Sequence, residues 1–131
     1  MKNELSKDNE AHTLYSEQTT VDLTAFGVLV DSEFALAQAC TEIDDKSGAY
    51  EHYLRAAGAA EAGYSTAFKK RTTSSSRLFM GKYAEAAVLA YLQAGWKSTA
   101  VSLGIYVTSQ HRNLPEVNKQ RILENLNLNH K

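Results

Sequence analysis

The stretch Arg77–Gly95, RLFMGKYAEAAVLAYLQAG, decides the fold class of this chain. Phe79, Tyr83, Ala87 and Tyr91 follow one another at intervals of four residues, which places them on one face of an α-helix. The alanines between them favour a helix, because alanine loses no side-chain entropy there. The terminal glycine of the stretch is suited to end the helix in the left-handed conformation.

The sequence after this stretch predicts two more helices. The first covers residues 98–110, with Ser98 as its N-cap, although residues 103–107 can also form a short strand. Pro115 suits the first turn of a helix, so it opens the last one, which carries Ile122 and Leu126 on its apolar face.

The sequence before this stretch is also helical in pattern. Residues 20–43 place apolar side chains at spacings of three and four, which predicts one helix with a bend allowed at Gly27. The alternative is a strand over residues 26–30 followed by a helix from Ser32. Residues 1–18 are polar and non-periodic, so we expect a flexible N-terminal segment before a single domain over residues 19–131.

Turn signals divide the middle of the chain. Residues 44–48 form a turn, and Ser47 is placed to cap a helix that Gly63 would end. A further helix would start at Ser65 or Thr66, and the hydroxyl run 72–76 either breaks it or leaves it continuous. We therefore predict an all-α, orthogonal, compact bundle of five or six short helices.

Composition narrows the class of protein. The chain has 131 residues, 44% of them hydrophobic and 22% charged, as in a soluble single domain. The single cysteine, Cys40, excludes an internal disulfide and fits a reducing compartment, and its apolar neighbours predict a core residue. We find no apolar run of about twenty residues and no signal-peptide pattern, so we expect a cytoplasmic protein without a membrane partner.

Charge is sorted along the chain. Residues 1–61 carry twelve carboxylates and four Lys or Arg, a net charge of −8. Residues 62–115 carry seven Lys or Arg and one carboxylate, Glu85, a net charge of +6. A basic segment inside a nearly neutral protein can hold an anion, and the acidic part limits non-specific binding.

The densest basic stretch predicts a binding surface for DNA or another polyanion. Its cations would contact phosphates while its hydroxyls donate short hydrogen bonds. The candidate residues are Lys69, Lys70, Arg71, Thr72, Ser74, Ser75, Arg77 and Lys82. The alternative is an exposed connection without a ligand, because charge runs usually form solvated faces.

Two places have the spacing of a helix-turn-helix, in which a glycine four residues after a small residue allows the turn. The first is Ala59 with Gly63, followed by a helix that carries the basic stretch. The second is Ala100 with Gly104. In both, a polar residue lies at the position six residues after the glycine, where the motif needs an apolar one.

The blocks Ala62-Gly63-Tyr64-Ser65 and Ser76-Arg77-Leu78, with the aromatic-rich helix before them, resemble the DNA-binding domain of phage small terminase subunits. The resemblance covers about thirty residues. It implies DNA binding by a helix-turn-helix in a protein of a phage or bacterial mobile element.

The acidic half supports a different hypothesis, a small helical module for protein–protein interaction, such as an inhibitor, adaptor or assembly subunit. Its acidic side chains would dock on a basic surface, or the two halves of the chain would pair in a homodimer or other oligomer. The candidate residues are Glu42, Asp44, Asp45, Glu51 and Glu61.

Signals of catalysis are few. His12, His52, His111 and His130 have no metal-ligand spacing with one another or with Cys40. The chain has no glycine-rich phosphate loop and no nucleophile motif. We therefore expect a non-catalytic protein without a metal or cofactor.

Overall fold

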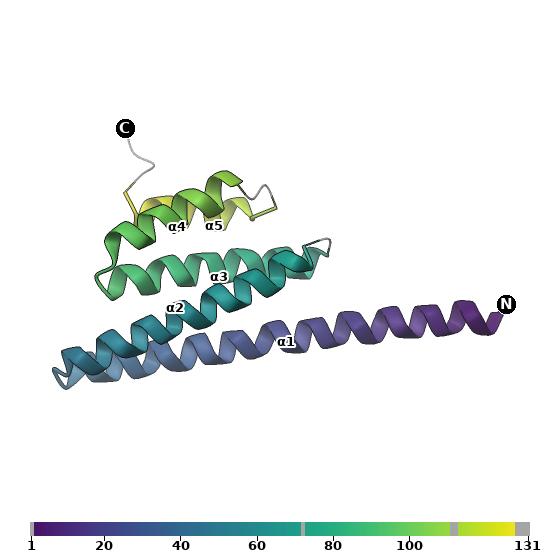
Figure 1. The fold of residues 1–131 in the computed structure, drawn as a ribbon, viewed down its shortest axis with the longest axis horizontal. Helices are drawn as coiled ribbons and strands as arrows, with labels where there is room; N and C mark the ends of the chain where they lie inside the picture. Colours follow the sequence, from purple (N-terminus) through teal and green to yellow (C-terminus); the bar gives the residue numbers. More distant parts are fainter. Residues whose placement is uncertain (1, 72, 111–112, 128–131) are drawn as a thin grey trace.

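The computed structural model describes residues 2–71, 73–110 and 113–127, and these residues form five helices and no strand (Figure 1). The all-α prediction is confirmed, and the alternative strands at residues 26–30 and 103–107 are wrong. The helices are α1 (Lys2–Glu42), α2 (Lys46–Lys69), α3 (Ser74–Gln93), α4 (Lys97–Gln110) and α5 (Glu116–Asn125). They are not all short, because α1 has 41 residues.

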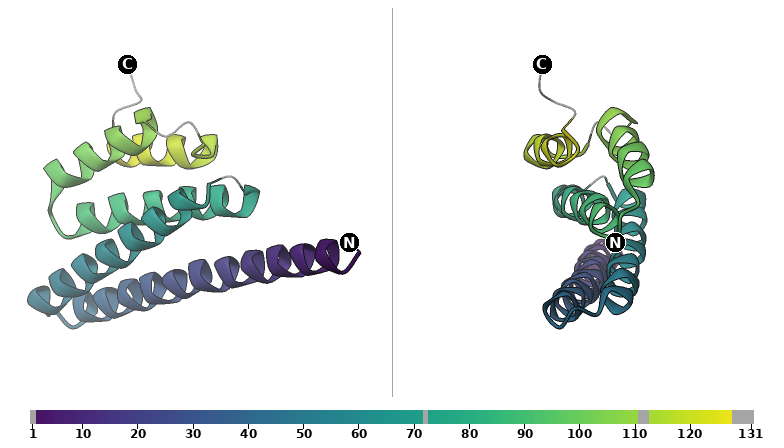
Figure 2. Two further views of the ribbon diagram at one scale, coloured as in Figure 1. Left: turned by 45° about the vertical axis from the view of Figure 1, so that its right-hand side comes forward. Right: turned by 90° about the vertical axis from the view of Figure 1, so that its left-hand side faces the viewer.

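Helix α3, the stretch that decides the fold class, is the centre of the bundle. It contacts each of the other four helices. Helices α1 and α2 form a hairpin on one side of α3, and α4 and α5 cover the other side (Figures 1 and 2). This position explains why α3 carries an apolar pattern around much of its circumference.

Tyr83 of α3 anchors the core between α1 and α2. Its side chain is fully buried, and its hydroxyl donates a hydrogen bond to the carbonyl of Leu23 in α1. Phe79 stacks on the Tyr83 ring, and Phe26 meets it edge-on. On the other side of α3, a second cluster joins Met80, Ala84 and Val88 to buried residues of the last two helices, Ala100, Val107, Ile122 and Leu126.

Gly63 and Gly104 do not make the turns that the sequence predicts for them, and each lies inside a helix. Gly63 is buried in the middle of α2, and a Cβ there would lie 2.6 Å from the Tyr83 ring. Gly104 is buried in α4, against Leu126 and Ile122 of α5. Both glycines let helices approach closely, so the prediction that Gly63 ends a helix is wrong. Gly95, with a φ of +86°, ends α3 as predicted.

The predicted helix start at Ser65 or Thr66 is wrong, because α2 continues to Lys69, and the other connections are confirmed with small shifts at the caps. Asp45 rather than Ser47 caps α2, and its carboxylate accepts a 2.9 Å hydrogen bond from the Gly48 N–H. The helix is interrupted at the hydroxyl run, between the end of α2 and the start of α3, and Thr73 caps α3. Pro115 precedes α5 as expected.

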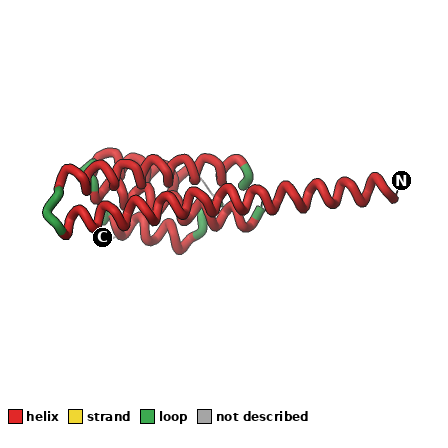
Figure 3. The backbone as a smooth tube through the Cα atoms, turned by 90° about the horizontal axis from the view of Figure 1, so that it is seen from below, coloured by secondary structure: helices red, strands yellow, loops and turns green. Residues whose placement is uncertain are grey.

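Helix α1 extends well beyond the rest of the bundle (Figures 1 and 3). Among the α1 residues whose burial is described, 22–42, the first buried one is Leu23. The helix includes residues 2–18, and the flexibility of that segment stays a prediction.

Within α1, Asp22–Glu42 is long and apolar enough to cross a membrane by length and composition, which corrects our expectation that no stretch has this property. Its most apolar window has a mean hydropathy of 1.3, and 22% of that window is buried in the bundle. Core helices of soluble proteins share such a composition, so the stretch alone does not identify a membrane span.

Candidate functional site

The predicted basic residues gather where α2 ends and α3 begins. Lys69 is the last residue of α2, Lys70 is its C-cap, and Arg77 lies in the first turn of α3. Lys82 lies farther along α3, on the side that faces Gly27 of α1. Thr72 lies outside the described residues. We call the surface formed by Lys69, Lys70, Arg71, Thr73, Ser74, Ser75 and Arg77 the basic turn.

Two arginines of the basic turn hold its backbone in place. The Arg71 guanidinium donates to the carbonyl of Phe68 at 3.0 Å and lies 4.2 Å from the centre of the Phe68 ring. The Arg77 guanidinium donates to the carbonyl of Arg71 at 3.0 Å and contacts the Ser74 hydroxyl at 3.5 Å. Because a guanidinium has five N–H donors, each arginine keeps donors for a ligand.

The N-terminus of α3 adds to the positive field of the basic turn. The Thr73 hydroxyl accepts a 3.2 Å hydrogen bond from the Ser76 N–H, while Ser74 and Ser75 are exposed in the first turn. The positive end of the helix dipole lies at these residues. Lys69, Arg71 and Arg77 take part in neither of the ion pairs described for this structure, His52–Glu33 and Arg121–Glu85.

The structure contradicts both helix-turn-helix predictions. Residues 59–63 and 100–104 lie inside the continuous helices α2 and α4, so neither glycine makes a turn. The Ala62-Gly63-Tyr64-Ser65 block is helical, and Ser76-Arg77-Leu78 belongs to the start of α3. The resemblance to terminase subunits therefore stays a prediction, without the motif that it implied.

Four of the five candidate acidic residues lie together at the opposite end of α2. Glu42, Asp44, Asp45 and Glu51 are all exposed around the α1–α2 turn. Glu61 lies apart from them, half-buried on α2, and accepts a 2.6 Å hydrogen bond from the Tyr91 hydroxyl.

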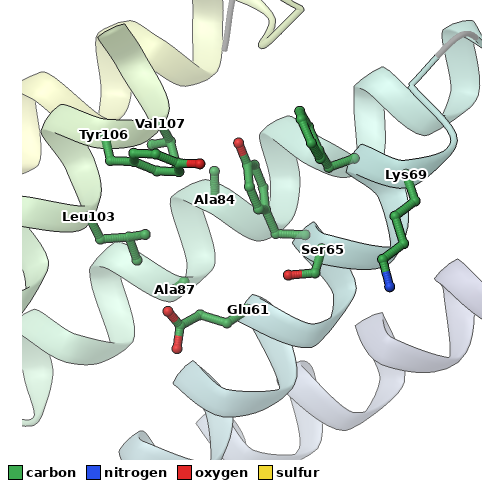
Figure 4. A pocket seen from close by; sticks show the side chains of 10 residues that line it. Glu61, Ser65, Lys69, Ala84, Ala87, Leu103, Tyr106 and Val107 are labelled. Atoms are coloured by element: carbon green, nitrogen blue, oxygen red, sulfur yellow. The ribbon is translucent and has the colours of Figure 1, made fainter. Parts of the chain in front are cut away.

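A pocket of about 380 Å³ opens between α2, α3 and α4, and sequence reasoning missed it (Figure 4). Its walls are mainly apolar and aromatic, with Glu61, Ser65 and Lys69 as polar members along α2. The other lining residues are Tyr64, Phe68, Ala84, Ala87, Leu103, Tyr106 and Val107. The aromatic residues were visible in the sequence, but only the packing of three helices brings them around one space.

Tyr64 in this pocket and the single cysteine, Cys40, are both held in their protonated forms. Burial raises the pKa of Tyr64 well above its usual range, and the neighbouring Tyr106 hydroxyl adds to the effect. Burial and the Asp45 carboxylate raise the pKa of the Cys40 thiol. Among the described residues, no group of three His, Cys, Asp or Glu side chains is placed to hold a metal ion.

Comparisons of the chain with protein-family models, curated proteins and solved structures found no match.

Proposed function

We propose that the protein binds nucleic acid or another polyanion through the basic turn, without catalysis. The observation that carries this proposal is the convergence of Lys69, Arg71 and Arg77 with the hydroxyl-rich N-terminus of α3, outside any described ion pair. Clustered cations of this kind neutralise the phosphates of a nucleic acid and release their counterions.

The form of the surface suggests contact with the backbone of a nucleic acid rather than readout of its bases. Arg71 and Arg77 are held by carbonyls of the turn, which fixes their positions but limits their reach. The exposed hydroxyls of Ser74 and Ser75 are short donors that suit phosphate oxygens. We therefore expect binding that is strongly dependent on salt and nearly independent of sequence.

The test is fluorescence anisotropy with a labelled DNA duplex over a range of salt concentrations. Changing Lys69, Lys70 and Arg71 to alanine should weaken binding by about tenfold or more and flatten the salt dependence, since each lost phosphate contact releases fewer counterions. The matched control changes Lys46, Lys97 and Lys119, which lie away from the basic turn, to alanine.

Equal weakening of DNA binding in both triple variants would mean that only the net charge of the protein matters. Unchanged DNA binding in the Lys69, Lys70 and Arg71 variant would show that the basic turn does not bind DNA. Circular dichroism of each variant separates lost binding from lost fold.

The second candidate function is docking of a basic protein on the acidic α1–α2 turn. It is favoured by the separation of the two charged ends, which a 24-residue helix places about 36 Å apart. A heparin column distinguishes the two functions, because it retains a polyanion binder and releases a protein that acts through its acidic end. The variants Glu42→Gln, Asp44→Asn and Glu51→Gln leave the Asp45 cap intact and should abolish binding only in the second case.

A further inference from the structure

The side of α1 that faces away from the bundle is apolar, and we call it the outer face. Leu29 is 53% exposed, Leu36 is 47% exposed and Ile43 is 76% exposed. Leu29 and Leu36 lie roughly a third of a turn around α1 from the buried Leu23 and Val30, and Ile43 follows the last residue of α1. The outer face consists of Ala25, Val28, Leu29, Ser32, Ala35, Leu36, Ala39 and Ile43, all of them exposed.

No charged residue interrupts the outer face. Asp22 and Glu42 lie at its two ends, Asp31 lies on its flank, and Glu33 turns inward to pair with His52 at 2.6 Å. The solvent side of a surface helix is normally polar, and a continuous exposed apolar surface marks an interaction site.

The spacing of the outer face is that of a helix which pairs with another helix. Six of its residues repeat at alternating intervals of four and three, the heptad pattern of a coiled coil. They are Ala25, Leu29, Ser32, Leu36, Ala39 and Ile43. Large and small side chains alternate strictly along this series.

We propose that a second copy of this chain covers the outer face, with the two α1 helices antiparallel and related by a two-fold axis beside residue 34. In this register every small residue of one copy faces a large residue of the other. The facing pairs are Ala25 with Ile43, Leu29 with Ala39, and Ser32 with Leu36. Complementary volumes of this kind fill the seam without voids.

A parallel pair fits less well, for two reasons. It would place Ser32 on Ser32 and Ala39 on Ala39, which leaves gaps between layers of leucine. It would also bring the two acidic α1–α2 turns, with Asp44 and Asp45, side by side.

The antiparallel pair instead places the acidic turn of one copy at the same end as the basic turn of its partner, because Leu23 and Ala67 lie in one cluster within each copy. Charge therefore favours the same orientation as packing.

The area of the outer face limits the affinity of the dimer. From residue 25 to residue 43 it is about 27 Å long. Two such faces bury on the order of 1,000 Å², which is near the lower limit for a specific interface. We therefore expect a reversible dimer with a dissociation constant in the micromolar range, independent of the polyanion that the basic turn binds.

The test is sedimentation equilibrium of the full chain and of charge variants on the outer face. Leu29→Glu and Ala39→Lys should each raise the dissociation constant at least tenfold, because each places a charge in the apolar seam. The matched controls, Gln38→Glu and Gln38→Lys, introduce the same charges at an exposed position beside the face and should leave it unchanged.

The orientation has its own test. An equimolar mixture of the Leu29→Glu and Ala39→Lys chains, and a chain with both changes, should associate more tightly than either single variant. Only the antiparallel register brings position 29 of one copy opposite position 39 of the other.

Several outcomes would overturn the proposal. They are a wild-type chain that stays monomeric at high micromolar concentration, a dimer unaffected by both single variants, and single variants that the mixture fails to rescue although they remain helical. Cosedimentation of wild-type monomers with lipid vesicles, abolished by Leu29→Glu, would assign the outer face to a membrane instead.

Discussion

At the scale of single residues, the bundle depends on glycines that lie against large side chains. The Tyr83 ring lies against Gly63 of α2, and its hydroxyl reaches α1 beside Gly27. Any side chain at position 63 would overlap the ring, so the tyrosine can be fully buried only because the glycine has no Cβ.

We predict that Gly63→Ala lowers the free energy of unfolding by about 1–3 kcal/mol, the usual cost of overpacking a core. The measurement is urea denaturation followed by circular dichroism. Gly58→Ala is the control, because position 58 is an exposed site in the same helix with nothing near a new Cβ. That change should raise stability by about 0.5–1 kcal/mol, since alanine favours a helix over glycine. Equal changes in the free energy of unfolding at positions 63 and 58 would show that helix propensity, and not the contact with Tyr83, determines the effect of Gly63→Ala.

At the scale of helices, side-chain hydrogen bonds join neighbours whose apolar contacts are made by small residues. The Tyr91 hydroxyl of α3 donates to the Glu61 carboxylate of α2, beside the alanines that pack these helices together. Burial and this carboxylate raise the pKa of Tyr91 to about 12. The fold therefore favours the protonated hydroxyl.

We predict that this bond makes stability fall at alkaline pH. In the unfolded chain the Tyr91 hydroxyl has its ordinary pKa of 10.0, and in the folded chain its pKa is about 12. The contribution of Tyr91 to the free energy of unfolding is therefore complete below pH 10 and is lost as the pH rises towards 12. Urea denaturation from pH 8 to pH 11.5 should show a smaller alkaline fall in Tyr91→Phe than in the wild type. Glu61→Gln keeps an acceptor but removes the charge, so it should reduce the fall in part. Identical pH profiles in all three chains would rule out this contribution.

At the scale of the whole molecule, α1 is longer than the helices against which it packs. Among the α1 residues whose burial is described, 22–42, the buried ones run from Leu23 to Ala37, and α1 packs on α2 and α3. Its first half extends beyond the other helices (Figure 1). The described buried residues of α1 and the outer face both lie from residue 23 on.

We predict that removing residues 1–19 leaves the thermal midpoint of unfolding within about 2 °C of the full chain, because the described core of α1, from Leu23 to Ala37, is kept. The dissociation constant of the dimer should also stay unchanged, since the outer face begins at residue 25. Removal of residues 1–30 takes away Leu23 and Val30 and should unfold the domain. A large loss of stability in the shorter truncation would mean that the first half of α1 packs on the molecule.

Local patterns in the sequence were enough to predict the helical class and several of the boundaries. The four-residue spacing from Phe79 to Tyr91 predicts α3, and Gly95 predicts its end, while the hydroxyl run left both a break and a continuous helix open. These features depend on backbone preference and on the periodicity of a single helix, which neighbours along the chain determine. The density of basic residues from Lys69 to Arg77 was also visible in the sequence, but the sequence did not decide whether they lie on a helix or in a turn.

Only the tertiary structure decided what Gly63, Glu61 and α1 do. A glycine suits a left-handed turn and a close helix contact equally well, so the sequence could not exclude a helix-turn-helix at Gly63 before Tyr83 was placed against it. Glu61 is part of the acidic segment in the sequence, but in the fold it accepts a hydrogen bond from Tyr91 and lines the pocket. In the second half of α1, apolar residues lie around most of the helix circumference, and their spacing does not tell which side the bundle covers. That depends on where α2 and α3 pack, and their packing leaves Leu29, Leu36 and Ile43 uncovered.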